Sequence, residues 1–279
     1  MLTTIREDGL VDLQDDAGSG PALATALRTF RDSGMLVLPD VFDAARVAAL
    51  RSAYDELLRA ELGHDTSDRV QPTDGRRHVQ MQMPLVSPFS DVETVAHPLV
   101  VRVLTGILGD GFHCSYYNSN TAFPGSTYQR VHRDAGPVFG TDLGVPTPTT
   151  AVVVNIPLCD FTRENGSTEV WPASHLIVDS AEDADVDLTT RAQSLASARM
   201  DVPAGAVVIR DLRLWHRGVP NESGEARSML AVVYQRAWLS WRARSLRVPA
   251  ATWESWPDHV RSIFSTAPVD AEHEEAATA

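Results

Sequence analysis

The run Ala151-Val152-Val153-Val154-Asn155-Ile156 predicts a buried β-strand, because β-branched side chains pack well on a pleated surface. The chain changes to this β-rich texture near residue 112, and turns containing Gly and Pro separate the strand-like runs. The other runs are Tyr116-Tyr117, Glu169–Trp171, Ala206–Ile209 and Met229–Gln235. Many short strands of this kind favour an antiparallel jelly roll.

The part of the chain before these runs has helical periodicity. Apolar residues recur at helical spacing after Pro21, and Gly34 is expected to end that helix. A short buried strand is predicted at Met35–Leu38, Asp43 is a candidate N-cap for a second helix, and a third helix is predicted near 91–108. The expected fold is mainly β, a double-stranded β-helix (jelly-roll or cupin-like) core with N-terminal helices packed on it.

The chain is expected to form one domain, because no repeat and no Pro/Gly/Ser linker divides it. An acidic stretch at 179–187 is expected to be an exposed loop. The expected parts are an N-terminal extension (1–20), mainly helical support (21–111), the jelly-roll core (112–240), a C-terminal helical segment (241–267) and a disordered tail (268–279).

Composition narrows the classes of function. A net charge of −13 and a pI near 5.0 argue against nucleic-acid and anionic-membrane surfaces as partners. All 24 basic residues are Arg, so Schiff-base chemistry and a phosphate-binding loop that needs Lys are excluded. The chain begins without a signal-peptide pattern and contains no run long enough to span a membrane. A cytoplasmic protein with a small-molecule partner is expected, and nothing predicts its oligomeric state.

Two histidines and one aspartate carry the chemical signal. His132 and Asp134 are two residues apart, so on a strand both side chains point to the same face. His216 follows 84 residues later, between a β-run and a turn. Two imidazoles and a carboxylate can occupy one face of an octahedral iron(II), which leaves positions for a chelating co-substrate and O2. Taken alone, His132-Arg133-Asp134 is a common tripeptide, and an ordinary polar role would suit it equally.

Arg227 lies eleven residues after His216. Its planar guanidinium can bind a carboxylate through two parallel hydrogen bonds, as the far end of a dicarboxylate co-substrate would need. The alternative is a solvated arginine at a strand edge.

Residues 25–240 resemble the phytanoyl-CoA dioxygenase-like family of iron(II)/2-oxoglutarate oxygenases. The resemblance rests on His132-Arg133-Asp134, on the segment at 165–175 (NGSTEVWPASH), and on His216 with Arg227 at the family's spacing. The opening stretch at 32–39 with its following helix is also similar. The chain departs from the family in having Ala173 where the motif PGSH has Gly, and in having no Lys for a co-substrate contact.

The resemblance implies a role for several residues. His132, Asp134 and His216 would bind iron and form the catalytic centre, and Arg227 would pair with the distal carboxylate of 2-oxoglutarate. Further polar contacts to 2-oxoglutarate are candidates, although a purely structural hydrogen bond would explain each one equally well. These candidates are Gln129, Gln80 with its strand neighbour Gln82, and Asn155. His175 is expected to be structural.

The substrate is less visible than the metal site. An aromatic, partly apolar pocket would suit a small natural product or an amino-acid-like metabolite. Candidate pocket residues, each of which can equally belong to the core, are Tyr116, Tyr117, Asn118, Phe123, Phe139, Trp215 and Trp238. An arginine-rich segment can bind an anionic group or be a solvated face; it contains Arg236, Arg242, Arg244 and Arg247.

The expected function is oxidation of a small, secondary-metabolite substrate with release of succinate and CO2. Asp134 favours hydroxylation, desaturation, epoxidation or ring formation over halogenation, because halogenating relatives have a small residue at that position. Two alternatives stay open: a cupin-like metal enzyme that does not use 2-oxoglutarate, and a non-catalytic metabolite-binding barrel.

Overall fold

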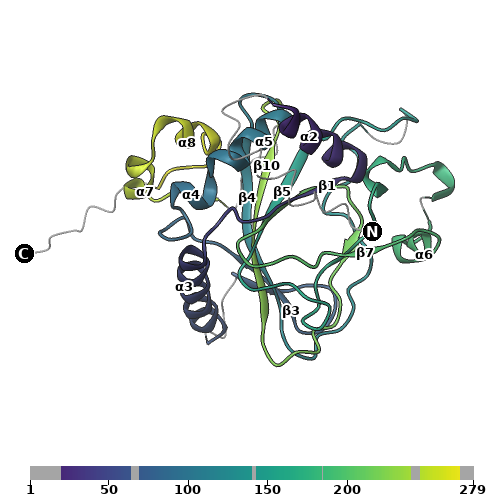
Figure 1. The fold of residues 1–279 in the computed structure, drawn as a ribbon, viewed down its shortest axis with the longest axis horizontal. Coiled ribbons are helices and arrows are strands. Elements are labelled where there is room, and N and C mark those ends of the chain that lie inside the picture. The colour runs from purple at the N-terminus through teal and green to yellow at the C-terminus, as the bar shows by residue number, and fades with distance from the viewer. Residues whose placement is uncertain (1–19, 64–68, 140–142, 184, 240–245, 271–279) are drawn as a thin grey trace, which may run out of the picture.

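The computed structural model describes residues 20–63, 69–139, 143–183, 185–239 and 246–270. Two antiparallel sheets form the core, which confirms the predicted jelly roll with helical support (Figure 1). The large sheet has seven strands in the order β1-β8-β5-β10-β4-β3-β2, and the small sheet has three in the order β7-β6-β9. The large sheet contains β1 (Met35–Leu38), β2 (Val70–Pro72), β3 (His78–Gln82), β4 (His113–Ala122), β5 (Ala151–Pro157), β8 (Val207–Asp211) and β10 (Arg227–Gln235); the small sheet contains β6 (Glu169–Val170), β7 (Ala198–Arg199) and β9 (His216–Arg217).

Strand β5 shows how the sequence builds two different faces on one sheet. Every residue of β5 is buried. Val152, Val154 and Ile156 pack into the main hydrophobic core, whereas Val153 and Asn155 face a cavity on the other side. This alternation follows from the two-residue period of a strand. The single polar residue of the run therefore lies on the face where a ligand can meet it.

Helices cover the outer face of the large sheet. Helix α2 (Pro21–Ser33) ends at Gly34, whose φ of 80° is left-handed and whose N–H donates to Phe30, as predicted. Helix α3 (Ala44–Leu62) begins with the Asp43 side chain accepting a hydrogen bond from the Arg46 N–H, also as predicted. The remaining helical segments are α4 (Val92–Val95), α5 (Pro98–Leu108), α6 (Leu188–Ala192), α7 (Ala250–Ser255), α8 (Asp258–Ile263) and the short turns η2 (Ser174–Leu176) and η3 (Ala181–Asp183).

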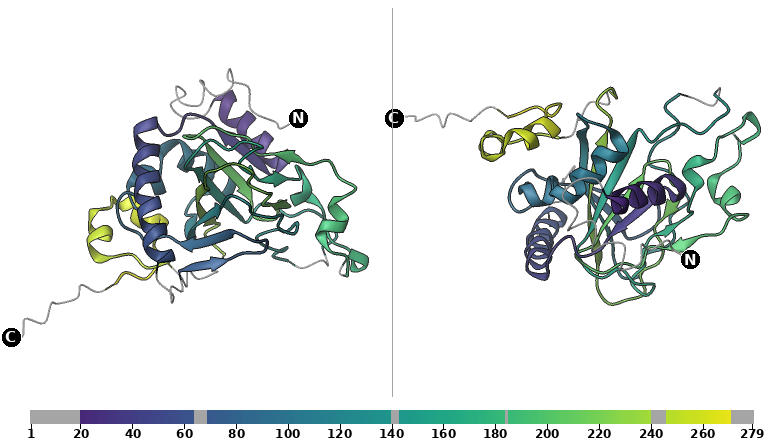
Figure 2. Two further views of the ribbon diagram at one scale, coloured as in Figure 1. Left: turned by 90° about the horizontal axis from the view of Figure 1, so that it is seen from below. Right: turned by 45° about the horizontal axis from the view of Figure 1, so that its top comes forward.

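The views agree on how these parts are arranged. Helices α3, α4, α7 and α8 lie on one side of the large sheet, and α6 with the small sheet lies on the other (Figure 1). In both views of Figure 2, the C-terminal helices and the region around α6 lie on opposite sides of the molecule. One side of the large sheet is therefore closed by helices, and the other is free to form a cavity.

The predicted helix at 91–108 is wrong as a single element. It is two helices, α4 and α5, because Pro98 favours an extended conformation at the preceding residue, and His97 has φ −52° and ψ 129°. Between α3 and β3, strand β2 was not predicted; it pairs antiparallel with β3.

Two further expectations change. The acidic stretch at 179–187 is not simply an exposed loop: it contains η3, and Asp179 forms ion pairs with Arg133 and Arg191. In the tail predicted to be disordered, Pro268 and Asp270 form backbone hydrogen bonds with Val248 at 3.0 and 2.9 Å. Residues 1–19 and 271–279 lie outside the described residues. Among the helices that the structure describes, none is long and apolar enough to cross a membrane.

Candidate metal centre and its cavity

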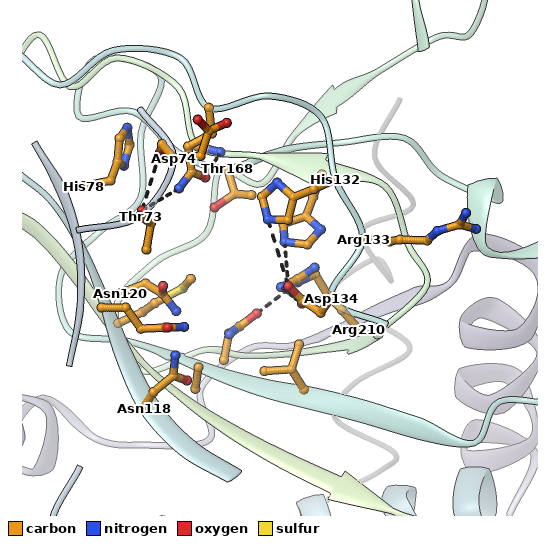
Figure 3. A pocket seen from close by; sticks show the side chains of 18 of the residues that line it. Thr73, Asp74, His78, Asn118, Asn120, His132, Arg133, Asp134, Thr168 and Arg210 are labelled. Atoms are coloured by element: carbon orange, nitrogen blue, oxygen red, sulfur yellow. Dashed lines mark hydrogen bonds and ion pairs between the residues drawn. The ribbon is translucent and has the colours of Figure 1, made fainter. Parts of the chain in front are cut away.

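His132, Asp134 and His216 lie together, as predicted, and their candidate ligand atoms are all within 4.8 Å of one another. Figure 3 shows His132 and Asp134 next to each other at the cavity. Asp134 Oδ1 is 3.5 Å from His216 Nε2 and 4.0 Å from His132 Nε2. The centroids of the two imidazole rings are 4.3 Å apart. Two imidazole nitrogens and one carboxylate oxygen therefore converge on a single point, as a metal ion requires.

The backbone brings the two histidines together. His132 and His216 form an isolated antiparallel bridge with two reciprocal hydrogen bonds of 3.0 and 2.9 Å. The Asp134 N–H donates to the Leu212 carbonyl at 2.8 Å. His132 and Asp134 are thus not on a regular strand, which corrects the sequence prediction, but their side chains still converge.

Hydrogen bonds fix which imidazole nitrogen faces the centre. His132 Nδ1 is 2.9 Å from the Arg130 carbonyl, and His216 Nδ1 is 2.9 Å from the Leu214 carbonyl. A carbonyl oxygen can only accept, so each Nδ1 carries a hydrogen that it donates. The Nε2 lone pairs are then free to bind a metal, an orientation that metal-binding histidines commonly receive from a backbone carbonyl.

Burial sets the protonation states of the centre. Burial, with the nearby Arg210 cation, lowers the pKa of His216 to about 3, so this ring is neutral at pH 7. Desolvation opposes ionisation of Asp134, but its interactions with the adjacent His216 and with the Arg210 cation outweigh this and hold the pKa of the carboxyl below its usual range. A carboxylate beside a neutral imidazole is the state that a divalent cation needs.

Arg210, on β8, completes the centre and was not predicted. Its side chain is buried; Nη2 lies 3.4 Å from Asp134 Oδ2, and Nε donates to Asn155 Oδ1 at 3.0 Å. In the sequence it directly follows the apolar residues Val207–Ile209, so it looked like the polar end of a strand. The only hint of a functional role was a charged residue next to a run that is expected to be buried.

The centre opens into a cavity of about 800 Å³ that also contains Arg227. Arg227 is 3% exposed, and its Nε and Nη1 atoms have no hydrogen-bond partner among the described residues. Its guanidinium carbon lies 4.7 Å from the centre of the Phe161 ring. Burial lowers its pKa to about 10, which keeps it cationic at pH 7. A buried cation without a counter-charge is prepared for an anionic ligand.

Three of the four other candidates for co-substrate contacts also line this cavity. The Gln129 amide bonds Thr73 Oγ1 at 2.9 Å and the Gly218 N–H at 2.7 Å, so it has a structural role. Asn155 has a structural hydrogen bond as well, because its Oδ1 accepts from Arg210 Nε. Gln80 lines the cavity, whereas Gln82 is not among the lining residues.

The predicted substrate residues divide into two groups. Tyr116 and Asn118 line the cavity. Trp215 does not: it is 1% exposed and packs against Trp171, because adjacent residues of an extended segment point to opposite sides and His216 takes the inward side. Phe139 and Trp238 are also outside the lining; they are exposed and contact each other with ring centres 6.1 Å apart.

The remaining candidates have structural surroundings. Tyr117 is buried in the core and donates to the Phe89 carbonyl, and Phe123 packs against the same core. His175 bonds the Arg31 carbonyl at 3.0 Å, in keeping with its predicted structural role. In the arginine-rich segment, Arg236 donates to backbone carbonyls and Arg247 pairs with Asp270. Arg242 and Arg244 lie outside the described residues.

The fold and the site together define a double-stranded β-helix protein with a two-histidine, one-carboxylate candidate metal centre in its cavity. The chain belongs to the phytanoyl-CoA dioxygenase (PhyH) family, whose model matches residues 30–229. The resemblance predicted from the sequence is thereby confirmed.

One curated relative and two solved structures illustrate what the chain is similar to. Dioxygenase aneA of Aspergillus aculeatus is 30% identical over 182 residues, which span 62% of this chain and 58% of aneA. AviO1 from Streptomyces viridochromogenes Tue57 has a similar fold, with a TM-score of 0.62 and 21% identity over 79% of this chain and 97% of AviO1. The epimerase SnoN, solved with Fe3+, alpha ketoglutarate and nogalamycin RO, has a TM-score of 0.60 and 19% identity over 90% of this chain and 96% of SnoN.

Proposed function

We propose that this protein is an iron(II)- and 2-oxoglutarate-dependent dioxygenase that oxidises a small molecule of secondary metabolism. The observation that carries the proposal is the presence in one cavity of the converging His132, Asp134 and His216 ligands and the unpaired Arg227 cation. Membership of the PhyH family supports it. SnoN, with a similar fold, was solved with iron and alpha ketoglutarate.

Each residue has a distinct task in this proposal. The Nε2 atoms of His132 and His216 and Oδ1 of Asp134 would hold iron on one face, and Arg227 would bind the distal carboxylate of 2-oxoglutarate. Bound iron supplies the redox chemistry by which R–H, 2-oxoglutarate and O2 become R–OH, succinate and CO2, with the two atoms of O2 divided between R–OH and succinate. The protein orients both substrates and keeps water away from the reacting carbon.

The structural features weigh against the two alternatives. A cupin-like enzyme without 2-oxoglutarate has no evident use for Arg227, a buried cation that no described carboxylate neutralises. A non-catalytic barrel has no use for two imidazoles whose Nδ1 hydrogen bonds turn their Nε2 atoms toward one carboxylate. The carboxylate of Asp134 also favours hydroxylation or a related oxidation over halogenation.

The proposal is tested with the purified protein under anaerobic conditions. We expect about one equivalent of iron(II) to bind, and 2-oxoglutarate to bind only after iron. On exposure to O2, succinate should form slowly even without substrate. Asp134→Ala should lose iron binding and succinate formation, whereas Asp270→Ala, at the distant ion pair with Arg247, should retain both. Iron binding without 2-oxoglutarate binding would favour the cupin-like alternative.

A further inference from the structure

Side-chain amides line the cavity wall that faces the metal centre. Gln80 on β3, Asn118 and Asn120 on β4, and Asn155 on β5 all lie on the inward face of the large sheet. Gln80 is paired in register with Asn120, and Ala231 of β10 lies between Asn118 and Asn155. Figure 3 shows Asn118 and Asn120 across the cavity from His132 and Asp134. We call these four residues the amide wall.

The amide wall has unused hydrogen-bonding capacity. Asn155 is fully buried, and its Nδ2 atom has no partner in the described part of the chain. Asn118 is 3% exposed, and no hydrogen bond joins its side chain, or those of Gln80 and Asn120, to any residue that the structure describes. Buried polar groups are nearly always hydrogen-bonded in folded proteins. Asn155 Nδ2 therefore points to a ligand that supplies the missing acceptor, and the other three amides line the same cavity beside it.

The chemistry of amides narrows the class of that ligand. A carboxamide is uncharged and offers donors and an acceptor together, which matches hydroxyl groups. An anionic ligand would need free cations, but Arg227 serves the co-substrate in the proposed function. The other lining arginines are already paired with carboxylates: Arg130 with Asp74, Arg133 with Asp179 and Arg210 with Asp134. An apolar ligand would leave the amides unpaired, which disfavours its binding.

The surfaces between the amides fit the same ligand class. Val153, Ala231 and Val233 present small apolar groups, and Tyr116 adds an aromatic ring. A ring that carries hydroxyl groups has polar edges and C–H faces, so it can meet amides and apolar patches together. The cavity has a volume of about 800 Å³, which is large enough to hold such a ring beside 2-oxoglutarate.

We propose that the substrate presents an uncharged, hydroxyl-rich ring, as in a saccharide or a cyclitol, to the amide wall. This inference rests on the proposed function, because it assigns Arg227 to the co-substrate. It replaces the aromatic pocket expected from the sequence, since Phe139, Trp215 and Trp238 do not line the cavity.

The test compares rings that differ in their hydroxyl groups. Protein loaded with Zn(II), which cannot support turnover, and with 2-oxoglutarate is mixed with myo-inositol, methyl α-D-glucopyranoside or methyl α-L-rhamnopyranoside, and separately with cyclohexanol or menthol. Saturation-transfer NMR titrations give the affinity for each probe. We expect the hydroxyl-rich probes to bind more tightly than the apolar rings.

Isosteric variants locate the binding. Asn118→Leu and Asn120→Leu keep the side-chain size and remove the hydrogen bonds, so each should weaken binding of the hydroxyl-rich probes roughly tenfold and strengthen binding of cyclohexanol. Gln193→Leu, at the exposed end of α6, is the matched control and should change neither. Asn120 is less buried than Asn118, so its variant preserves the test if Asn118→Leu does not fold.

Each result has a distinct meaning. Tighter binding of the apolar rings, no binding of either class, or unchanged binding of the hydroxyl-rich probes in both Leu variants would overturn the inference. Calorimetry of 2-oxoglutarate with the same Zn(II)-loaded protein is a separate readout. Failure of 2-oxoglutarate to bind would contradict the proposed function. If 2-oxoglutarate binds but the protein prefers the apolar rings, only the proposed substrate class is contradicted.

Discussion

Arg210 Nη2 lies 3.4 Å from Asp134 Oδ2, while Asp134 Oδ1 faces His216 Nε2 at 3.5 Å. The two oxygens of one carboxylate thus have different partners. Arg210 is held in turn by Asn155, which accepts a hydrogen bond from its Nε atom. This arrangement leaves a single oxygen of Asp134 for a metal ion and keeps the other engaged.

Arg210→Met should change co-substrate binding more than metal binding. Loss of the cation removes repulsion toward a metal ion, so iron(II) affinity should stay within about tenfold of wild type or increase. With Oδ2 released, Asp134 can bind the metal through both oxygens and obstruct the keto acid, so 2-oxoglutarate affinity should fall roughly tenfold or more. Calorimetric titrations of each ligand measure both effects.

Arg210→Lys separates charge from geometry. Lysine keeps the positive charge but replaces the planar guanidinium fork by a single ammonium group. It should leave iron(II) affinity at the wild-type value and still weaken 2-oxoglutarate binding. Wild-type 2-oxoglutarate affinity in both variants would show that Arg210 does not position Asp134.

Arg227→Met should have opposite effects on stability and on binding. The unpaired buried guanidinium destabilises the ligand-free fold, so a neutral side chain should raise the free energy of unfolding by about 1–3 kcal/mol. The affinity for 2-oxoglutarate should fall roughly 100-fold, because its carboxylate loses its charged partner. Urea unfolding and calorimetry measure the two quantities. Arg236→Met is the matched control: it removes hydrogen bonds to the Thr149, Leu108 and Ile107 carbonyls and should destabilise the fold.

His216 should make the metal-free protein sensitive to acid. Its pKa is about 3 in the fold and about 6.5 in an unfolded chain, so the unfolded chain takes up the proton first. Stability is therefore highest above pH 6.5 and falls by up to about 1.4 kcal/mol per pH unit for this site as the pH drops toward 3. The lowered pKa values of His78, His97, His113 and His175 act in the same direction.

Urea unfolding between pH 7.5 and pH 4 in chelator-treated buffer measures this effect. His216→Asn should give a shallower decline on the acid side, and His259→Asn, at an exposed position on α8, should match wild type. Parallel curves for wild type and His216→Asn would show that His216 is not buried as a neutral ring.

Ala173→Gly should stabilise the fold by about 0.5–1 kcal/mol. Ala173 has φ 66°, a left-handed conformation that costs a residue with Cβ about 1–2 kcal/mol, partly offset by the greater freedom of glycine in the unfolded chain. Ala49→Gly, at an exposed position within α3, should instead destabilise by about 1 kcal/mol. If the backbone at Ala173 is strained, thermal and urea unfolding should show a higher free energy of unfolding for Ala173→Gly and a lower one for Ala49→Gly.

The sequence predicted what depends on local rules. Gly34 and Asp43 mark helix ends through their own backbone and side-chain chemistry, and both predictions are confirmed. The convergence of His132, Asp134 and His216 was also predictable, because their spacing in the sequence matches the family's metal-binding motif. Pro98 could have divided the helix predicted at 91–108, had its effect on the preceding residue been considered.

What was missed depends on contacts between distant segments. Arg210 looks like the polar end of β8, and only the approach of Asp134 and Asn155 gives it a role. Trp215 was assigned to the pocket from its place beside His216, although alternation along an extended segment puts neighbours on opposite sides. The amide wall is assembled from β3, β4 and β5, so no single stretch of sequence contains it.

The backbone bridge between His132 and His216 joins positions 84 residues apart. A metal ion held by both histidines would act as a removable crosslink that closes this long loop, which should raise the protein's resistance to unfolding and proteolysis when metal is plentiful. The supply of metal in the cell would then control the lifetime of the protein as well as its activity.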